Sequence, residues 1–237
     1  ATLTATGGVP PRIWSLISGA LPPGLTLNPT AGSIGGIPAA TGIFPFTVQA
    51  SDAGNPVQRA SAALSITVIA LPASFSLWAT NAIPAQADAG SDNSVELGVK
   101  FRSDVAGFVT GIRFYKAAAN TGTHVGTLWN TKKVQLATVM FTNETAAGWQ
   151  QAMLALPVGI SANTVYVVSY HSNNGHYSED DNYFASAGVD SPPLHALAGG
   201  VSGGNGVYAY GKSSVYPSKT YQSANYWVDV IFVTTTN

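Results

Sequence analysis

The stretch TGTHVGTLW, residues 121–129, decides the fold of this chain. Three further segments share its aromatic and β-branched character, namely GWQ at 148–150, YVVSYH at 166–171 and YWVDVIF at 226–232. Residues of these types are enriched in strands, so the four segments predict consecutive strands and turns of one aromatic-rich β domain. We expect any recognition site to lie in that domain.

Composition excludes two classes of partner. Only 9% of the 237 residues are charged, and the formal net charge is −1. A nucleic-acid site needs clustered Lys and Arg to neutralise phosphates, and the chain has no basic run. No apolar run approaches the roughly 20 residues that span a bilayer. We therefore expect neither nucleic-acid binding nor membrane insertion.

Cysteine is absent from the chain, so stability must come from packing or from a bound metal ion. Bacterial exported β modules often lack disulfides, and a neutral, polar composition is typical of them. We therefore expect a secreted or cell-surface bacterial protein, monomeric and linked to further modules.

Residues 1–69 contain short apolar runs separated by Pro and Gly turns, which predicts strands without helical periodicity. Their motifs are Trp14, LPPGL at 21–25, AGSIGGIP at 31–38, FTV at 46–48 and Asp52. With these motifs the segment resembles the Ig-like family of cadherin-like, dystroglycan-type modules. The resemblance implies a sandwich with Trp14 in its core. Because residue 1 looks internal to a strand, we expect a truncated copy of that module.

A domain boundary is predicted at the Pro-containing joint, residues 70–74. All ten Tyr and all but one of the eleven acidic residues lie beyond it, and such a shift in composition marks a boundary. We therefore expect an Ig-like spacer over 1–69, a linker over 70–74 and a second domain over 75–237.

The second domain is predicted to be a jelly-roll-like β-sandwich, because it contains eight or nine strand patterns, the first near Trp78, and no convincing helix. Alternation in GIRFYK, residues 111–116, places Ile112 and Phe114 inward and Arg113 and Tyr115 outward. The fold class is therefore all-β, an Ig-like sandwich followed by a jelly-roll-like one.

Several motifs of this second part recur together: ELGVKF at 96–101, GIRFYK, TGTHVGTLW, ETAAGWQ at 144–150, YVVSYH, GHY at 175–177 and YWVDV at 226–230. With them it resembles a bacterial domain of unknown function that occurs in large exported proteins beside Ig-like modules. The resemblance covers nearly all of residues 76–233. It implies a family and no activity.

Carbohydrate is the ligand class that the sequence favours. Sugar rings stack on aromatic faces and accept hydrogen bonds from polar side chains at the rim. The long polar loop at 172–191 and the Tyr-rich segments after it supply both, and loop aromatics are less suited to a core than strand aromatics. The predicted ligand-binding residues are His176, Tyr177, Asp181, Tyr183, Tyr216 and Tyr221.

Two metal sites are also considered. Asp92 and Glu96 flank the start of an early strand, and Asp229 lies in the last one, so together they predict a structural Ca²⁺ site. The alternative is that Asp229 pairs with Arg113 or Lys100. A transition-metal site at His124, His171 and His176 is weighed against hydrogen-bonded histidines at strand ends.

Two further functions remain open. An adhesion or structural surface module would use its aromatics to bind a protein partner. A polysaccharide-active enzyme would need two carboxylates across a cleft, and none of the acidic residues forms a recognisable pair of this kind. The favoured function is a non-catalytic carbohydrate-binding accessory module.

Overall fold

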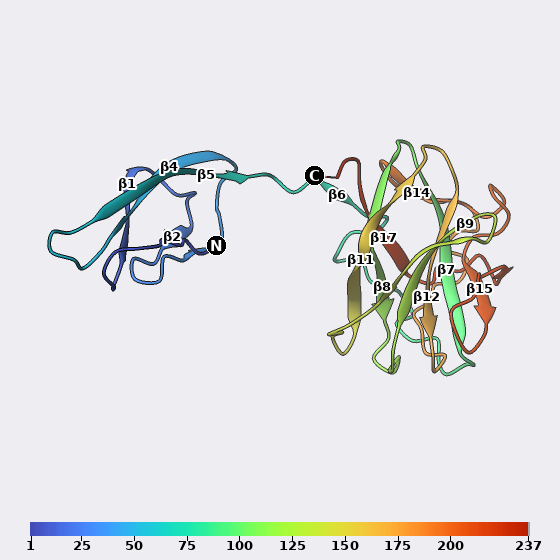
Figure 1. Cartoon of the computed structure of the whole chain (residues 1–237). Coiled ribbons are helices and arrows are strands. Elements are labelled where there is room, and N and C mark those ends of the chain that lie inside the picture. The colour runs from blue at the N-terminus through green and yellow to red at the C-terminus, as the bar shows by residue number, and fades with distance from the viewer. Residues whose placement is uncertain (237) are drawn as a thin grey trace. The chain divides into compact units, whose positions relative to one another are not determined.

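The computed structural model describes residues 1–236, and these form strands and no helix (Figure 1). The prediction of an all-β protein is confirmed. The chain divides into two compact units, Ala1–Leu71 and Pro72–Asn237. Within the described residues, no helix is long and apolar enough to cross a membrane.

The first unit is a small sandwich with a sheet in the order β1-β4-β5 and a ribbon of β2 and β3. Its core consists of Ile34, Phe46 and Val48. In the LPPGL turn the Leu25 amide donates to the Pro22 carbonyl at 3.0 Å. The strands are β1 (Ile13–Gly19), β2 (Leu25–Leu27), β3 (Ile34–Gly36), β4 (Gly42–Ser51) and β5 (Arg59–Val68).

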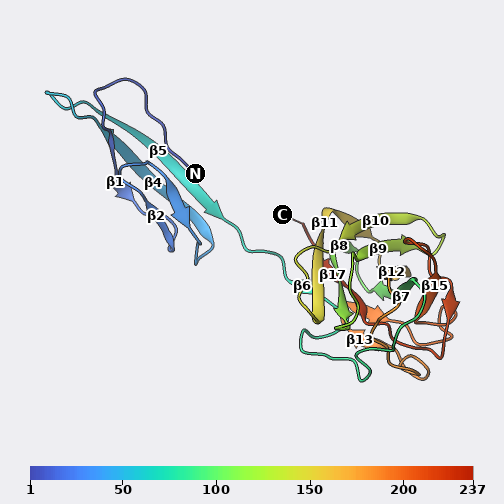
Figure 2. The ribbon, with the colours of Figure 1, turned by 90° about the horizontal axis from the view of Figure 1, so that it is seen from below.

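The second unit is a larger sandwich of two antiparallel sheets, seen end-on in Figure 2. One sheet has the order β11-β8-β17-β6, and the other has β10-β9-β12-β7-β14-β13, with β15 and β16 beside β7. The strands are β6 (Ser74–Phe75), β7 (Val95–Ser103), β8 (Gly107–Lys116), β9 (Val125–Asn130), β10 (Gln135–Met140), β11 (Gly148–Ile160), β12 (Tyr166–Ser172), β13 (Val189–Ser191), β14 (Leu194–Ala196), β15 (Val207–Tyr210), β16 (Lys219–Thr220) and β17 (Val228–Val233).

The main core lies between these two sheets. Phe114 of β8 stacks on Tyr170 of β12, with ring centroids 4.3 Å apart. Leu97 of β7 and Val230 of β17 belong to the same cluster and are almost completely buried, as is Ile112. The alternation predicted for β8 is therefore confirmed, since its apolar positions face the opposite sheet.

The outer face of β8 and β17 is buried as well, although side chains there are polar. Arg113 pairs with Asp229 at 2.6 Å, as one reading of the sequence anticipated. The Asp229 carboxylate also accepts the backbone amides of Leu77 and Trp78, at 2.8 and 3.2 Å. The sequence predicts a strand near Trp78, but the backbone there is irregular. The Asp229 side chain accepts the backbone amides that would otherwise pair with a neighbouring strand.

The free edge of β7 is shared by two short strands. β14 pairs with the C-terminal part of β7 and β15 with its N-terminal part. At the junction, buried Asn205 accepts the amides of Lys100 and Gly206, both at 2.8 Å. Its side-chain amide donates to the carbonyls of Lys100 and Leu197, at 3.0 and 2.8 Å. One side chain thus replaces the missing ladder bonds and fixes where β15 begins.

Candidate functional site

A pocket of about 370 Å³ opens beside the N-terminal end of β7. That volume lies at the lower end of the range for small-molecule sites, roughly 300–1,000 Å³. Five tyrosines and two carboxylates dominate its lining, and we call it the tyrosine pocket. Its lining residues are Asp92, Val95, Leu97, Tyr177, Glu179, Tyr208, Tyr210, Tyr221 and Tyr226.

Two of the rings come from β15, which lies beside β7 in Figure 1 and also pairs with the short strand β16. Tyr208 stands opposite Leu97 and Tyr210 opposite Val95 in the antiparallel register. Residues two apart on a strand share a face, so both rings point to the same side as the two apolar residues of β7. The pleat therefore supplies one wall of the pocket.

The rings meet edge to face rather than in a flat row. Tyr177 and Tyr226 have centroids 6.0 Å apart at an interplanar angle of 77°. Tyr208 contacts Tyr226 at 6.4 Å and 71°, and Tyr210 at 5.6 Å and 75°. Because successive rings are nearly perpendicular, they border the tyrosine pocket on several sides.

Asp92 and Glu179 give the tyrosine pocket a negative electrostatic potential. Asp92 accepts a hydrogen bond from the hydroxyl of Tyr210, and this bond raises the pKa of that tyrosine to about 12. Burial, followed by the charge of Asp181, raises the pKa of Glu179 to about 7. Burial and then Glu179 raise the pKa of Tyr177 well above its usual range. Near neutral pH the Glu179 carboxyl is therefore only partly ionised.

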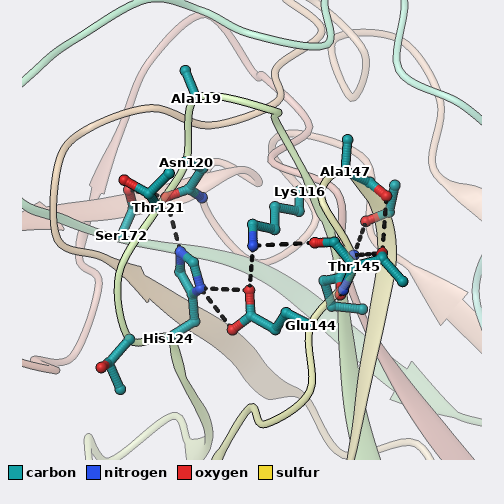
Figure 3. Close-up of polar contacts among 12 residues, drawn as sticks. Lys116, Ala119, Asn120, Thr121, His124, Glu144, Thr145, Ala147 and Ser172 are labelled. Atoms are coloured by element: carbon teal, nitrogen blue, oxygen red, sulfur yellow. Dashed lines mark hydrogen bonds and ion pairs between the residues drawn. The ribbon is translucent and has the colours of Figure 1, made fainter.

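A buried polar network braces the loop that carries Tyr177 (Figure 3). His124 Nδ1 lies 2.8 and 2.9 Å from the two carboxylate oxygens of Glu144, and Lys116 Nζ lies 2.8 Å from the same carboxylate. On its other side His124 Nε2 lies 2.9 Å from Asn120 Oδ1. Figure 3 shows this chain of contacts running from the start of β11 to the loop before β9.

The network continues into the pocket loop through Ser172. The Ser172 hydroxyl lies 3.0 Å from Asn120 Oδ1 and 3.0 Å from the carbonyl of His176. Asn174 Nδ2 donates to the carbonyl of Ala119 at 2.8 Å. The residue before Tyr177 is therefore tied to a rigid part of the sandwich.

Gly175 allows the same loop to approach the start of β7. Its φ is 67°, a left-handed conformation that glycine adopts without steric cost. The Asp92 amide donates to its carbonyl at 3.1 Å, and a Cβ at this position would collide with the Asp92 backbone. The close approach places Asp92 and Tyr177 on one pocket.

Two of the six predicted ligand-binding residues, Tyr177 and Tyr221, line the pocket. His176 lies beside it, with Nδ1 3.1 Å from both carboxylate oxygens of Asp88. Asp181 is exposed and is not part of the lining.

Tyr183 and Tyr216 belong to other aromatic clusters. The hydroxyl of Tyr183 accepts the indole N–H of Trp78 at 3.0 Å. Tyr216 packs against Trp129 with centroids 5.7 Å apart. The sequence analysis assigned Tyr183, Tyr216 and the pocket tyrosines to one site because they are close along the chain. In the structure, the strands between them place these side chains on different faces of the domain.

Besides two apolar residues, sequence reasoning left five aromatic or acidic pocket residues out of the predicted carbohydrate site. Tyr208 and Tyr210 were treated as strand aromatics suited to a core. The alternation in GVYAYG does indicate one shared face, but only the structure shows that this face of β15 lines a pocket beside β7. The omitted residues are Asp92, Glu179, Tyr208, Tyr210 and Tyr226.

The three residues predicted to bind calcium have separate partners. Asp92 lies at the tyrosine pocket, Glu96 accepts the hydroxyl of Ser169 at 2.5 Å, and Asp229 pairs with Arg113. Across residues 1–236, no three His, Asp or Glu side chains gather in a way that could hold a metal ion. The calcium site stays a prediction, and a melting temperature unchanged by rigorous chelation would contradict it.

The histidines considered as metal ligands also have different neighbours. His124 and His176 contact the carboxylates described above, while His171 Nε2 lies 2.9 Å from Ser94 Oγ and its Nδ1 3.3 Å from Glu96. The side chains of Ser94, His171 and Glu96 lie close together, but His171 Nδ1 and Glu96 Oε2 are buried without a hydrogen-bond partner among the described residues, so they do not form the hydrogen-bonded relay of a nucleophilic site. They lie on the face of β7 opposite the tyrosine pocket, because Glu96 alternates with the lining residues of that strand.

Comparison with protein families identifies both parts of the chain. Residues 81–228, more than half of the 237, match the family described as "Domain of unknown function (DUF4082)". The chain belongs to this family. Residues 2–69 match the family described as "Putative Ig domain", so both resemblances seen in the sequence are confirmed. A comparison with curated proteins found no match.

The DUF4082 domain contains the whole lining of the tyrosine pocket. Its pairing with an Ig-like domain suggests a non-catalytic accessory module.

Proposed function

We propose that the DUF4082 domain binds carbohydrate in the tyrosine pocket, as an accessory module of an exported bacterial protein. The observation that carries the proposal is the lining itself, where five tyrosine rings surround two carboxylates. Aromatic faces suit the C–H surfaces of a sugar ring, and carboxylates accept hydrogen bonds from sugar hydroxyls.

The shape of the pocket favours one sugar unit over a long polymer face. Its volume, about 370 Å³, is small, and the rings of Tyr177 and Tyr226 are nearly perpendicular. A surface that binds a flat polymer would present its aromatics in a row. We therefore expect recognition of a chain end or a branch.

Retention of the whole chain on insoluble cellulose, chitin, xylan and peptidoglycan tests the proposal. Tyr210→Ala and Tyr221→Ala remove pocket rings that are about half exposed, at 47% and 51%, so neither change should disturb the core. Tyr183→Ala is the matched control, because its ring is 36% exposed and lies outside the pocket.

Retention on one polymer that both pocket variants lose and the control keeps would support the site. Equal retention by all variants would exclude the tyrosine pocket as that site. If the chain flowed through every polymer, the proposal would fail in favour of a surface module with a protein partner.

A further inference from the structure

We propose that the tyrosine pocket takes a cationic group, the protonated amine of an amino sugar. This inference rests on the proposed function and narrows its ligand class. It comes from the charge of the lining, the arrangement of the rings and the cost of burying Glu179.

The charge balance of the pocket is one-sided. Among the described residues that line it, Asp92 and Glu179 are acidic and none is basic. The nearest cation with a ring contact is exposed Lys219, whose Nζ lies 6.0 Å from the ring centre of Tyr210. Like charges repel, so an anionic sugar is disfavoured. A neutral sugar supplies no counter-charge to these acidic groups, whereas an ammonium group does.

The ring arrangement suits a compact cation. The face of an aromatic ring attracts a cation within about 6 Å of its centre. Tyr177, Tyr208 and Tyr226 meet in succession at 77° and 71°, so their faces cannot all stack on one flat ring. They surround a small volume from several sides, which is the geometry of an aromatic cage for ammonium groups.

The state of Glu179 supports the same ligand. Its side chain is buried beside a second acid, Asp181, and burial is the larger cause of its raised pKa. A bound ammonium group would stabilise the ionised carboxyl and lower that pKa. Binding of a permanent cation should therefore release protons near neutral pH, a readout that a neutral ligand does not give.

Calorimetric titration of the whole chain near neutral pH, where an amine is largely protonated, tests the inference. The probes are a glucosamine hexamer, the matching N-acetylglucosamine hexamer and tetramethylammonium. We expect the glucosamine hexamer to bind about tenfold more tightly than its acetylated counterpart and tetramethylammonium to compete with it. Glu179→Gln and Asp92→Asn should each reduce this preference, while Asp190→Asn, a largely exposed carboxylate outside the lining, should leave it unchanged.

Each outcome separates this inference from the proposed function. Equal or tighter binding of the acetylated hexamer would overturn the cationic ligand and leave carbohydrate binding standing. Binding of tetramethylammonium without either hexamer would support the cage and overturn carbohydrate as its ligand. If none of the probes bound, the inference would fail, and the polymer retention experiment would decide the proposed function alone.

Discussion

Glu179 makes the stability of the second unit depend on pH. Its pKa rises from about 4.5 to about 7 on folding, through burial and then the charges of Asp181 and Asp180. A carboxyl with a raised pKa contributes stability that is complete below pH 4.5 and is lost as the pH rises through 7. Tyr177 and Tyr226 also face it, and both stay neutral over this range because burial raises their pKa.

Glu179→Gln should remove this loss, because an amide stays neutral at every pH. The stability of the variant minus that of the wild type should therefore increase between pH 4 and pH 8. After a discount for solvent screening, we expect this increase to be about 1 kcal/mol, or roughly 2–4 °C in Tm. Thermal melts of both proteins between pH 4 and 8 measure the difference. A difference that stayed constant with pH would contradict the assignment.

His124 should be neutral at pH 7. Burial lowers its pKa below 6.5 more than Glu144 raises it, with smaller lowering by Lys116 and His171. In a neutral ring that is protonated at Nδ1 and donates to Glu144, Nε2 carries no hydrogen and accepts a hydrogen bond. The group that faces Nε2 must therefore be a donor. The Nδ2 atom of Asn120, which is buried without a hydrogen-bond partner, fills this role if its amide turns.

The ¹⁵N chemical shifts of His124 should then report one neutral tautomer, protonated at Nδ1, from pH 8 down to 7. The histidine contributes stability above pH 6.5, and this is lost as the pH falls toward its lower folded pKa. An imidazolium signal at pH 7 would show instead that both ring nitrogens donate, to Glu144 and to Asn120.

At the scale of elements, Asn205 fixes the junction of β14 and β15. Asn205→Ala would leave the amides of Lys100 and Gly206 and the carbonyl of Leu197 without the Asn205 partner. Buried polar groups left unsatisfied cost about 1–3 kcal/mol each, and waters that enter would recover part of this. We expect a loss of about 3 kcal/mol in the second unit.

Urea denaturation measures that loss. Asn205→Asp is a second variant, since it keeps the acceptor for Lys100 and Gly206 but sets a buried carboxylate against the carbonyls of Lys100 and Leu197. Because an unpaired buried carboxylate is costly, its loss should be at least as large as that of the alanine variant and should decrease at acid pH, where a protonated carboxyl can donate. Equal stability of wild type and Asn205→Ala would show that β15 is placed by its ladder alone.

Strand patterns predicted most elements of the second unit because alternation is a local property. Ile112 and Phe114 lie in the core as their period of two indicates, and Asp229 pairs with Arg113 on the other face. The segment at Trp78 was predicted as a strand, because no local signal shows that a carboxylate distant in sequence takes its amide.

The pocket was only partly predictable for the same reason. Tyr177 and Tyr221 were chosen because they lie in loops, and both line the pocket. Tyr208 and Tyr226 are joined to them by sheet order and by the bend at Gly175. The order of strands in the sheet cannot be predicted from sequence spacing, because it depends on which strand pairs with the free edge of β7.

At the scale of the whole molecule, each unit has its own hydrophobic core. The first core centres on Ile34, Phe46 and Val48, and the second is a much larger cluster that includes Ile112. A small core supplies little free energy of folding. We therefore expect two unfolding transitions in calorimetry, with the first unit melting at the lower temperature.

The same conservative change in each core assigns the transitions. Ile→Val in a core costs about 1 kcal/mol, which is roughly 4–8 °C in a domain of the first unit's size and 2–4 °C in the second. Ile34→Val should move only the lower transition, and Ile112→Val only the upper one. A single transition that both variants shift would mean that the units unfold together. Two separable transitions would also mean that loss of the first unit leaves the tyrosine pocket folded, because its lining lies wholly in the second.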